Sequence, residues 1–413
     1  MRLLVLTHTF PPSRHSNAKR PFYLVKGFLD AGWQVDVVTS PLGRENPADS
    51  GAAQPGLRVF CPGDPTDQLR RATARNPFLY RAAVLATSGL MWPDTYVWWA
   101  MKALRYCRRQ PAYDRVLTFI LPASLLLTAR RPEFQGARLT FDFQESVTPQ
   151  YRLQQRRSPL QKLLLPRLAQ LERDALHYAG HVVFTADTNR RAYVDQGLVP
   201  ENVTAHIPYF YDAEVFRQPA NRLAEGLEIA YFGTFDWRGA RSPETFLRAL
   251  ARFLGKHPEA RPHTRFRFYG AWLPEHNAFL DELKLRDVAA IHPPISYAAY
   301  LEKLKQSPVL LLVVASAHNL FMPSKIVDYF GARRPIMAFV PRDSEMRHVL
   351  DQAGMSEFTC GEHDQEGGVV ALETLWRRYQ NGTLSVSAEK TRFWSSEVQI
   401  PRYVSLLTGT SSV

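Results

Sequence analysis

Short apolar runs alternate with amphipathic segments along this chain, as is typical of α/β proteins. Near the start, the apolar residues at 3–7 and 34–39 predict buried strands, and those at 18–31 recur at helical spacing until Gly32. In the second half the same alternation predicts a strand that ends in a glycine turn at Gly233. Further strands are predicted at 265–269, 289–291, 309–315 and 336–340. Parallel sheets covered by helices follow from this pattern.

The segment 320–340, LFMPSKIVDYFGARRPIMAFV, begins as a helix and ends as a buried strand. Its sequence predicts a helix that starts at Ser324 and is ended by Gly331 together with Pro335. Free N–H groups near Ser324 and Lys325, the helix dipole and the lysine charge together favour a diphosphate. Asp328 lies one turn further on the same helix face, where it could accept hydrogen bonds from a ribose. The alternative is a surface crossover in which Ser324 only caps the helix and Asp328 is solvated.

The first loop of the chain follows the predicted strand at 3–7. In open parallel sheets, ligands bind at the carboxyl ends of the strands, and this loop lies at such an end. Its residues Arg14, Ser16 and Asn17 are therefore candidate acceptor-binding residues, and His15 is a candidate catalytic residue. The alternative is a proline-broken surface loop with scattered polar residues.

The length of 413 residues suits two α/β domains, each with its own core. Residues 207–221 contain few core-forming alternations and are the expected linker. We therefore predict a Rossmann-like domain at 1–206 and a second one at 207–385. Two such domains would face a central cleft.

The composition is that of a folded, basic protein. Hydrophobic residues make up 45% of the chain and charged residues 22%, and the formal net charge of +12 favours anionic partners. Nucleic acid ranks last among these partners, because the basic residues are dispersed and no recognition motif appears. The three cysteines, Cys61, Cys107 and Cys360, have neither disulfide nor metal-ligand spacing, which fits a reducing compartment.

Two stretches in the first half suit a membrane surface. The stretch from Arg70 to Arg109 interleaves aromatic with basic residues, and the stretch from Tyr151 to Arg173 interleaves leucines with basic residues. The alternative is a set of helices with core aromatics and solvated arginines. No apolar run approaches the roughly 18 residues of a spanning helix, and the N-terminus lacks a signal-peptide pattern. We expect a cytoplasmic protein, peripheral on the inner face of the plasma membrane.

Several segments in this order resemble the GT-B glycosyltransferases, in particular glycosyltransferase family 4 and related bacterial surface-polysaccharide transferases. The resemblance covers nearly the whole chain. It is carried by THTFPPSRHSNAKR, LTFDFQES, LERDALHYAGHVVFTAD, HIPYFYDAEVF, YFGTFDWRG, FRFYGAW and PSKIVDYFGARRPI. It implies two doubly wound Rossmann-like domains, with residues 386–413 returning to complete the first.

The resemblance also implies an activity. A nucleotide-diphosphate sugar would bind to the second domain and an acceptor to the first, and the sugar would be transferred with retention of configuration. Neither metal nor cofactor is implied, because Arg238, Arg241, Lys325 and helix N–H groups could neutralise the leaving diphosphate. No D-x-D metal motif is present.

Residue by residue, Ser324 and Lys325 match the family's phosphate-binding helix start, and Asp328 matches its ribose-binding acid, commonly a glutamate. Gly233 matches the family's turn that lets the backbone approach the donor, and Gly270 is a further candidate donor-binding residue. Leu320 stands where many members have a sugar-contacting glutamate, which makes His318 and Asn319 the candidate substitutes.

The first domain departs from the family as well. Pro122 and Ser124 stand near the place where many relatives have a histidine. Asp142 and Glu145 match an acidic pair near the acceptor, so either is a candidate to orient or deprotonate an acceptor hydroxyl. The alternative for this pair is a strand end followed by a helix cap.

These observations predict a retaining glycosyltransferase that transfers a sugar from a nucleotide-diphosphate sugar to a lipid-linked or surface-polysaccharide acceptor. One alternative is a non-catalytic GT-B-like scaffold, suggested by Leu320 and the missing histidine. Another alternative is a GT-B sugar epimerase.

Overall fold

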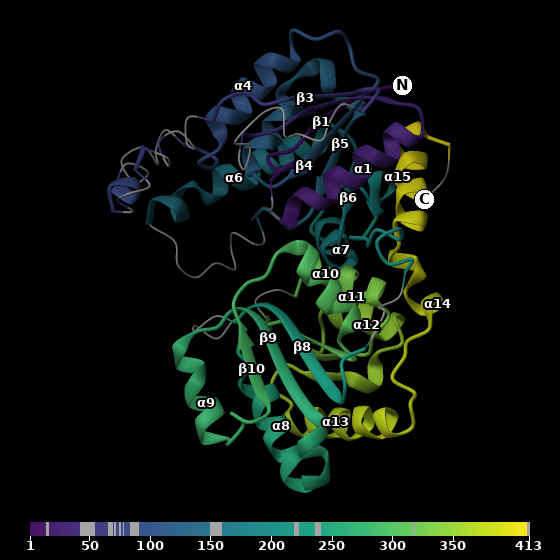
Figure 1. Cartoon of the computed structure of the whole chain (residues 1–413). Coiled ribbons are helices and arrows are strands. Elements are labelled where there is room, and N and C mark those ends of the chain that lie inside the picture. The colour runs from purple at the N-terminus through teal and green to yellow at the C-terminus, as the bar shows by residue number, and fades with distance from the viewer. Residues whose placement is uncertain are drawn as a thin grey trace. The chain divides into compact units, whose positions relative to one another are not determined.

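The computed structural model contains two compact units, each built on a parallel sheet (Figure 1). Unit 1 comprises Met1–Pro208 and Gln399–Val413, and unit 2 comprises Tyr209–Val398. The structure describes residues 1–13, 16–41, 54–64, 69, 72–73, 76, 78–82, 91–148, 159–218, 223–235, 241–316 and 319–410.

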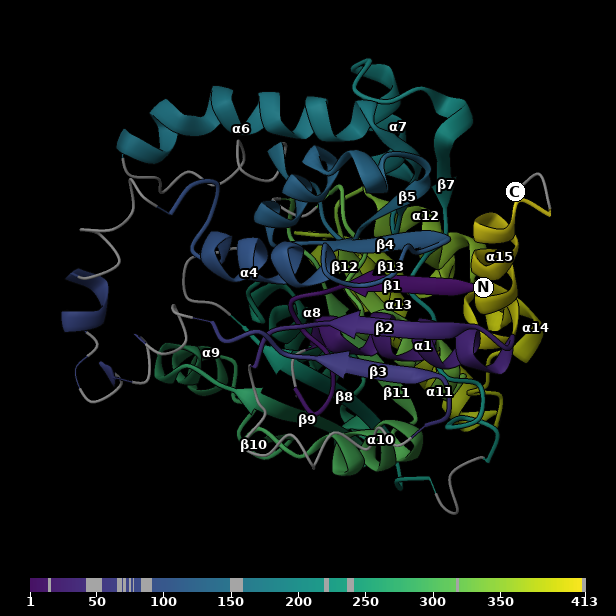
Figure 2. The ribbon, with the colours of Figure 1, turned by 90° about the horizontal axis from the view of Figure 1, so that it is seen from above.

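The sheet of unit 1 has seven parallel strands in the order β3-β2-β1-β4-β5-β6-β7. Figure 2 shows β3, β2, β1 and β4 side by side in this order. The chain reverses its direction across the sheet between β1 and β4, which makes that pair the switch point. The strands are β1 (Arg2–Leu6), β2 (Gln34–Val38), β3 (Leu57–Phe60), β4 (Arg115–Ile120), β5 (Gly136–Phe143), β6 (Ala179–Phe184) and β7 (Thr204–His206).

Helices complete unit 1, and the last of them enters it from the far end of the sequence. Helix α15 (Ser396–Thr408) belongs to this unit from Gln399 onward, so the chain returns to the first unit as predicted. The other α-helices described are α1 (Lys19–Asp30), α4 (Val97–Cys107), α6 (Pro159–His177) and α7 (Asp187–Asp195).

Unit 2 repeats the doubly wound arrangement with six strands in the order β10-β9-β8-β11-β12-β13. Its switch point lies between β8 and β11. All of its strand pairs are parallel, as the β-α-β pattern predicts. The strands are β8 (Leu227–Thr234), β9 (Thr264–Ala271), β10 (Ala289–His292), β11 (Val309–Val313), β12 (Ile336–Val340) and β13 (Thr359–Gly361).

The helices of unit 2 cover both faces of this sheet. Helices α8 and α13 contact each other, and α10 contacts α11 on the other face (Figure 1). The α-helices are α8 (Glu244–Lys256), α9 (Asn277–Glu282), α10 (Tyr297–Gln306), α11 (Lys325–Ala332), α12 (Glu345–Gln352), α13 (Gln365–Gln380) and α14 (Ala388–Thr391).

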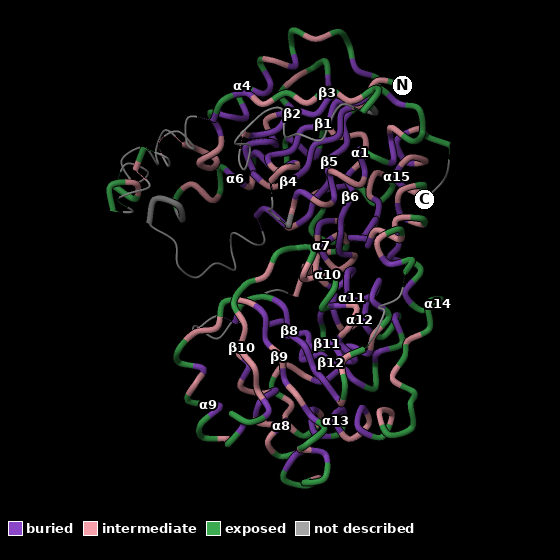
Figure 3. Tube along the Cα trace, in the orientation of Figure 1, coloured by how far each residue is buried: buried purple, intermediate pink, exposed green. Residues whose placement is uncertain are grey.

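Each unit has its own hydrophobic core, and Figure 3 shows that the central strands of both sheets are buried. Strands β11 and β12 are buried at every position, which explains their unbroken apolar sequences. The prediction of two α/β units with doubly wound sheets is therefore confirmed.

The structure differs from the sequence prediction at two local features. Gly331 does not end its helix but lies inside α11, where an added Cβ would come 2.5 Å from the ring of Phe216. Close helix packing explains this glycine. The helix ends at Ala332, and its C-cap residue Arg333 has a left-handed φ of 56°. The boundary between the units falls after Pro208, inside the expected linker at 207–221, but this segment also contributes Tyr209, Tyr211 and Phe216 to the core of unit 2. The apolar residues of this segment are irregularly spaced, so the sequence pattern did not predict their burial.

Candidate functional site

The candidate donor site lies at the switch point of unit 2, where Lys325 reaches from α11 to the end of β8. Its Nζ lies 3.3 Å from the carbonyl oxygen of Phe232, to which it donates, and 4.2 Å from the ring centroid of Tyr231. Helix α11 follows β11, the neighbour of β8, so its N-terminus lies at the carboxyl ends of the strands. Ligands of open α/β sheets bind at this position.

The environment of Lys325 favours an anion. Desolvation and, to a smaller extent, the positive charge of Arg241 lower the pKa of Lys325 from 10.5 to about 7. No carboxylate of the described residues lies within ion-pair distance of the Lys325 ammonium group. An anionic ligand would stabilise the charged form of this amine and so bind together with a proton. The structure thus brings Lys325 and Arg241 together, as the site hypothesis requires.

The start of α11 leaves Ser324 available to a ligand. Ser324 is the N-cap residue, but its side chain makes no capping hydrogen bond. Simple capping therefore does not explain this serine. The N–H of Ile326 donates to the carbonyl oxygen of Pro323, and the first N–H groups that lack an intrahelical partner add to the anion-binding character of Lys325.

Asp328 lies one turn along α11 and is held by a residue that the sequence did not single out. Its side chain is buried, and its Oδ2 accepts a hydrogen bond of 3.1 Å from the hydroxyl of Tyr300 in α10. Burial and the Asp328 charge raise the pKa of Tyr300 well above its ordinary value, so the hydroxyl keeps its proton and donates. The alternative of a fully solvated Asp328 is wrong.

Gly233 and Gly270 are register partners at the carboxyl ends of β8 and β9. Their φ angles, 140° and 155°, both lie in the region that favours glycine. A Cβ on Gly270 would come 1.7 Å from the carbonyl oxygen of Gly233. The close approach of the two backbones explains Gly270, whereas a donor contact at either glycine stays a prediction.

The remaining donor candidates lie in two loops. Asn319 follows β11, and its carbonyl oxygen accepts a hydrogen bond from the N–H of Glu345. Leu320, beside it, is partly buried. Arg238 and His318 lie outside the described residues. Their predicted contacts with phosphate and sugar stay predictions.

In unit 1, Asp142 forms the centre of a closed network. It lies within β5, is fully buried, and accepts hydrogen bonds from the Arg20 guanidinium and, at 2.8 Å, from the Tyr403 hydroxyl. Arg20 also donates to the carbonyl oxygens of Ile207 and Pro208. Because protein groups fill these positions, the geometry favours a structural role for Asp142, and its catalytic role stays an untested prediction.

The other first-unit candidates are only partly described. Glu145 follows β5 and is partly buried, and Ser16 and Asn17 form a 3-10 turn before α1. Arg14 and His15 lie outside the described residues. A catalytic role for Glu145 or His15 stays a prediction.

Sequence reasoning missed a polar cluster at the strand ends of unit 1. The Nε2 atom of His8, which follows β1, lies 3.7 Å from a carboxylate oxygen of Asp64. The ring of His8 packs against Tyr96, and Asp94 accepts hydrogen bonds from the N–H groups of Tyr96 and Ser124. Burial raises the pKa of Asp94. The position of His8 just after the first strand was the signal that could have revealed this cluster.

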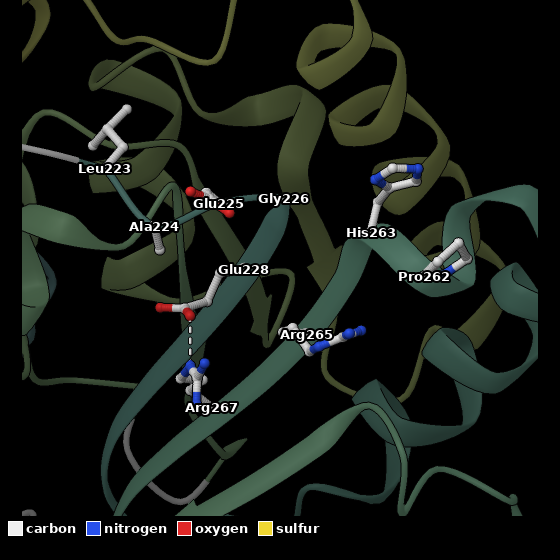
Figure 4. A pocket seen from close by; sticks show the side chains of 9 residues that line it. All are labelled: Leu223, Ala224, Glu225, Gly226, Glu228, Pro262, His263, Arg265 and Arg267. Atoms are coloured by element: carbon white, nitrogen blue, oxygen red, sulfur yellow. Dashed lines mark hydrogen bonds and ion pairs between the residues drawn. The ribbon is translucent and has the colours of Figure 1, made fainter.

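A cavity of about 610 Å³ lies at the amino ends of the unit 2 strands, away from the carboxyl ends where the candidate donor site lies (Figure 4). It is lined by residues at the amino ends of β8 and β9, and the Glu228–Arg267 ion pair stands in it. Since ligands of such sheets bind beyond the carboxyl ends, the position of this cavity does not match the predicted donor site.

Within the described parts of the chain, no group of three or more His, Cys, Asp or Glu side chains could hold a metal ion. The same residues contain no helix long and apolar enough to cross a membrane.

Comparison with known proteins finds similarity in structure only. No family model matches the chain, and no curated protein matches its sequence. The sucrose-phosphate synthase of Thermosynechococcus elongatus has a TM-score of 0.66 at 14% identity, over 99% of this chain and 100% of that one. The alpha,alpha-trehalose 6-phosphate synthase of Burkholderia multivorans has a TM-score of 0.64 at 13% identity, over 99% and 98%.

A third similar structure is the E. coli trehalose-6-phosphate protein bound with UDP-2-fluoro glucose. Its TM-score is 0.60 at 14% identity, over 99% of this chain and 95% of that one. At these identities the comparisons establish the fold, which is the GT-B fold of these proteins, and both sheets take part in it.

Proposed function

We propose that this protein is a retaining glycosyltransferase that uses a nucleotide-diphosphate sugar. The observation that carries the proposal is the partly buried Lys325 amine at the switch point of unit 2, close to Arg241 and one turn from Asp328. Cations and free helix N–H groups suit a diphosphate, and a carboxylate suits ribose hydroxyls. The E. coli structure of the same fold is bound with UDP-2-fluoro glucose.

In the reaction, the bond between the sugar C1 and the diphosphate oxygen breaks and a bond from C1 to an acceptor oxygen forms. The acceptor hydroxyl loses its proton, and the nucleoside diphosphate leaves with the bonding electrons. Lys325 and Arg241 would stabilise the negative charge that develops on the leaving group, as a metal ion does in other transferases. The reaction is therefore proposed to need no metal.

The proposed acceptor is a lipid-linked or surface-polysaccharide saccharide at a membrane surface. Helix α4 exposes Trp98, Met101, Lys102 and Arg105, while Trp99 on its other face is fully buried. The stretch from Arg70 to Arg109 thus contains both a core aromatic and an exposed aromatic beside basic residues. This combination suits the interface of an anionic bilayer. Residues 151–158 of the second basic stretch lie outside the described residues.

The first experiment measures thermal stabilisation by nucleotides and nucleotide sugars in the presence of EDTA. A ligand at 100 times its Kd should stabilise the wild-type protein by about 2.7 kcal/mol. Lys325→Ala and Asp328→Ala should lose this effect. The matched controls Lys256→Ala and Asp343→Ala, at exposed positions of the same unit, should keep it. The absence of stabilisation by any nucleotide would contradict the proposal.

Turnover is tested next with the donor that stabilises the protein. Incubation with a lipid-linked saccharide, followed by NMR of the product anomeric proton, checks both transfer and retention. Inversion would contradict the retaining mechanism.

Sedimentation with vesicles of anionic lipid should be lost in Trp98→Ala/Arg105→Ala but not in Arg217→Ala, whose side chain is exposed in unit 2.

A non-catalytic scaffold is the second candidate function. Leu320 favours it, because an apolar side chain cannot accept hydrogen bonds from sugar hydroxyls as a glutamate does. Nucleotide binding without turnover on any acceptor would support the scaffold.

A further inference from the structure

Aromatic side chains form a continuous row beside the Asp328 carboxylate. Phe232, Tyr269 and His292 are register partners on β8, β9 and β10. The Phe232 and Tyr269 rings stack with centroids 5.1 Å apart, and those of Tyr269 and His292 stack at 4.8 Å. Each residue lies within three positions of the carboxyl end of its strand. The row therefore runs along the sheet edge at which the donor site lies.

Helix α10 joins this row to Asp328 through Tyr300. The Tyr300 ring packs edge-on against Phe232, with centroids 5.1 Å apart, while its hydroxyl donates to Asp328. These two contacts fix the ring and the carboxylate relative to each other. Tyr300 is thus a positioning residue for Asp328.

Tyr297 extends the aromatic surface outward. It is the first residue of α10, and its ring stacks on Tyr300 with centroids 5.8 Å apart. Its exposed fraction is 44%, far more than that of a core aromatic. Because α10 begins after the carboxyl end of β10, Tyr297 lies at the same sheet edge as Lys325.

We propose that Tyr297 is the stacking surface for the nucleobase of the donor, and that Tyr300 orients Asp328 toward the ribose. This inference rests on the proposed function. A nucleotide with its diphosphate at Lys325 and its ribose at Asp328 places the base on the far side of the ribose. Tyr297, in contact with the Tyr300 that holds Asp328, offers an aromatic face there. Stacking recognises every base by its π-face, so this contact supplies affinity to purine and pyrimidine nucleotides alike.

The test measures the affinity of the full-length protein for nucleoside diphosphates and for inorganic pyrophosphate by titration calorimetry. Loss of a base–aromatic stack corresponds to roughly 5- to 150-fold weaker binding. Tyr297→Ala should weaken nucleoside diphosphate binding by this factor and leave pyrophosphate binding unchanged. Tyr297→Phe should keep the wild-type affinity. The matched control is Tyr178→Ala, which removes a tyrosine of 43% exposure from unit 1.

Tyr300→Phe tests the positioning role separately. It should weaken binding of a nucleoside diphosphate but not of its 2′,3′-dideoxy analogue, which lacks the hydroxyls that Asp328 would hold. Nucleoside diphosphate binding that is unchanged in Tyr297→Ala would overturn this inference alone. A wild-type protein that binds no nucleotide would overturn the proposed function and this inference with it.

Discussion

The two units share one sheet topology but differ in whether a charged side chain near the strand ends has a partner of opposite charge. In unit 1, Asp142 is enclosed by Arg20 and Tyr403 and has no exposed surface. In unit 2, no described carboxylate lies within ion-pair distance of Lys325, and desolvation lowers its pKa. Removal of one partner from a buried ion pair destabilises a fold strongly, whereas a desolvated amine without a counter-charge has the kind of perturbed pKa that is common at functional sites. We therefore expect local charge compensation, and not topology, to separate structural residues from ligand-binding residues in these two units.

The largest expected effect comes from removing Asp142 from its buried network with Arg20 and Tyr403. Asp142→Ala should lower the free energy of unfolding of unit 1 by about 3–5 kcal/mol, because it leaves the buried Arg20 charge unpaired. Chemical denaturation followed by tryptophan fluorescence measures this change. The control Glu214→Ala removes one partner of an ion pair whose side chains are both more than 60% exposed, and should change stability little. A stable Asp142→Ala protein that lacks only transfer activity would instead support the catalytic prediction.

The next effect concerns the strand ends of unit 2. Gly270→Ala should cost about 3 kcal/mol or more, because its Cβ would overlap the carbonyl oxygen of Gly233 and the φ of 155° strains alanine. The control is Gly255→Ala in α8, where no atom lies within 4 Å of an added Cβ. This control should be neutral or stabilising, since alanine favours helices. Equal unfolding midpoints for the two variants would contradict the close approach of β8 and β9.

The lowered pKa of Lys325 predicts that binding of a diphosphate depends on pH. An anionic diphosphate would raise this pKa, so binding takes up a proton above pH 7 and affinity should fall by up to about tenfold per pH unit. Titration calorimetry at pH 7, 8 and 9 in buffers of different ionisation enthalpy measures the proton uptake. Lys325→Arg stays charged and should flatten the profile. A wild-type profile as flat as that of Lys325→Arg would show that the lysine does not titrate.

The same pKa predicts an opposite trend for the stability of the ligand-free protein. Between pH 7 and 10.5 the unfolded chain holds a proton on Lys325 that the folded chain has lost, so the free energy of unfolding rises with pH in this window. The contribution of Lys325 is the difference in slope between the wild type and Lys325→Met, measured by urea denaturation. Identical slopes would mean that the folded and unfolded pKa values coincide.

The smallest expected effect tests the hydrogen-bond network around Asp142 in unit 1. Tyr403→Phe removes only the hydroxyl that donates to Asp142, so it should cost about 1–2 kcal/mol, less than Asp142→Ala. In the double variant the two costs should not add, because both substitutions affect one network. Additive costs would show that Tyr403 and Asp142 act independently.

The fold could be predicted well from the sequence because most of its strands and helices have short-range sequence patterns. Buried parallel strands such as β11 need unbroken apolar runs, and helix starts such as Ser324 have local signals. The long-range contacts had no such signal. Tyr403 lies 261 residues from Asp142, and Tyr300 lies 28 residues from Asp328, so no spacing rule links either pair. Gly331 was misread for the same reason, since its neighbour Phe216 is distant in sequence.

The return of α15 to unit 1 affects how the protein folds during synthesis. Residues 1–208 leave the ribosome long before Gln399, whereas unit 2 is continuous in sequence. The hydroxyl of Tyr403 therefore reaches Asp142 only after unit 2 has been synthesised. Domains generally fold as units as they emerge, so we expect unit 2 to complete its folding first and unit 1 to wait for its last helix. Until then the surface that α15 covers stays exposed, and nascent unit 1 is the part of the protein that most needs protection by chaperones.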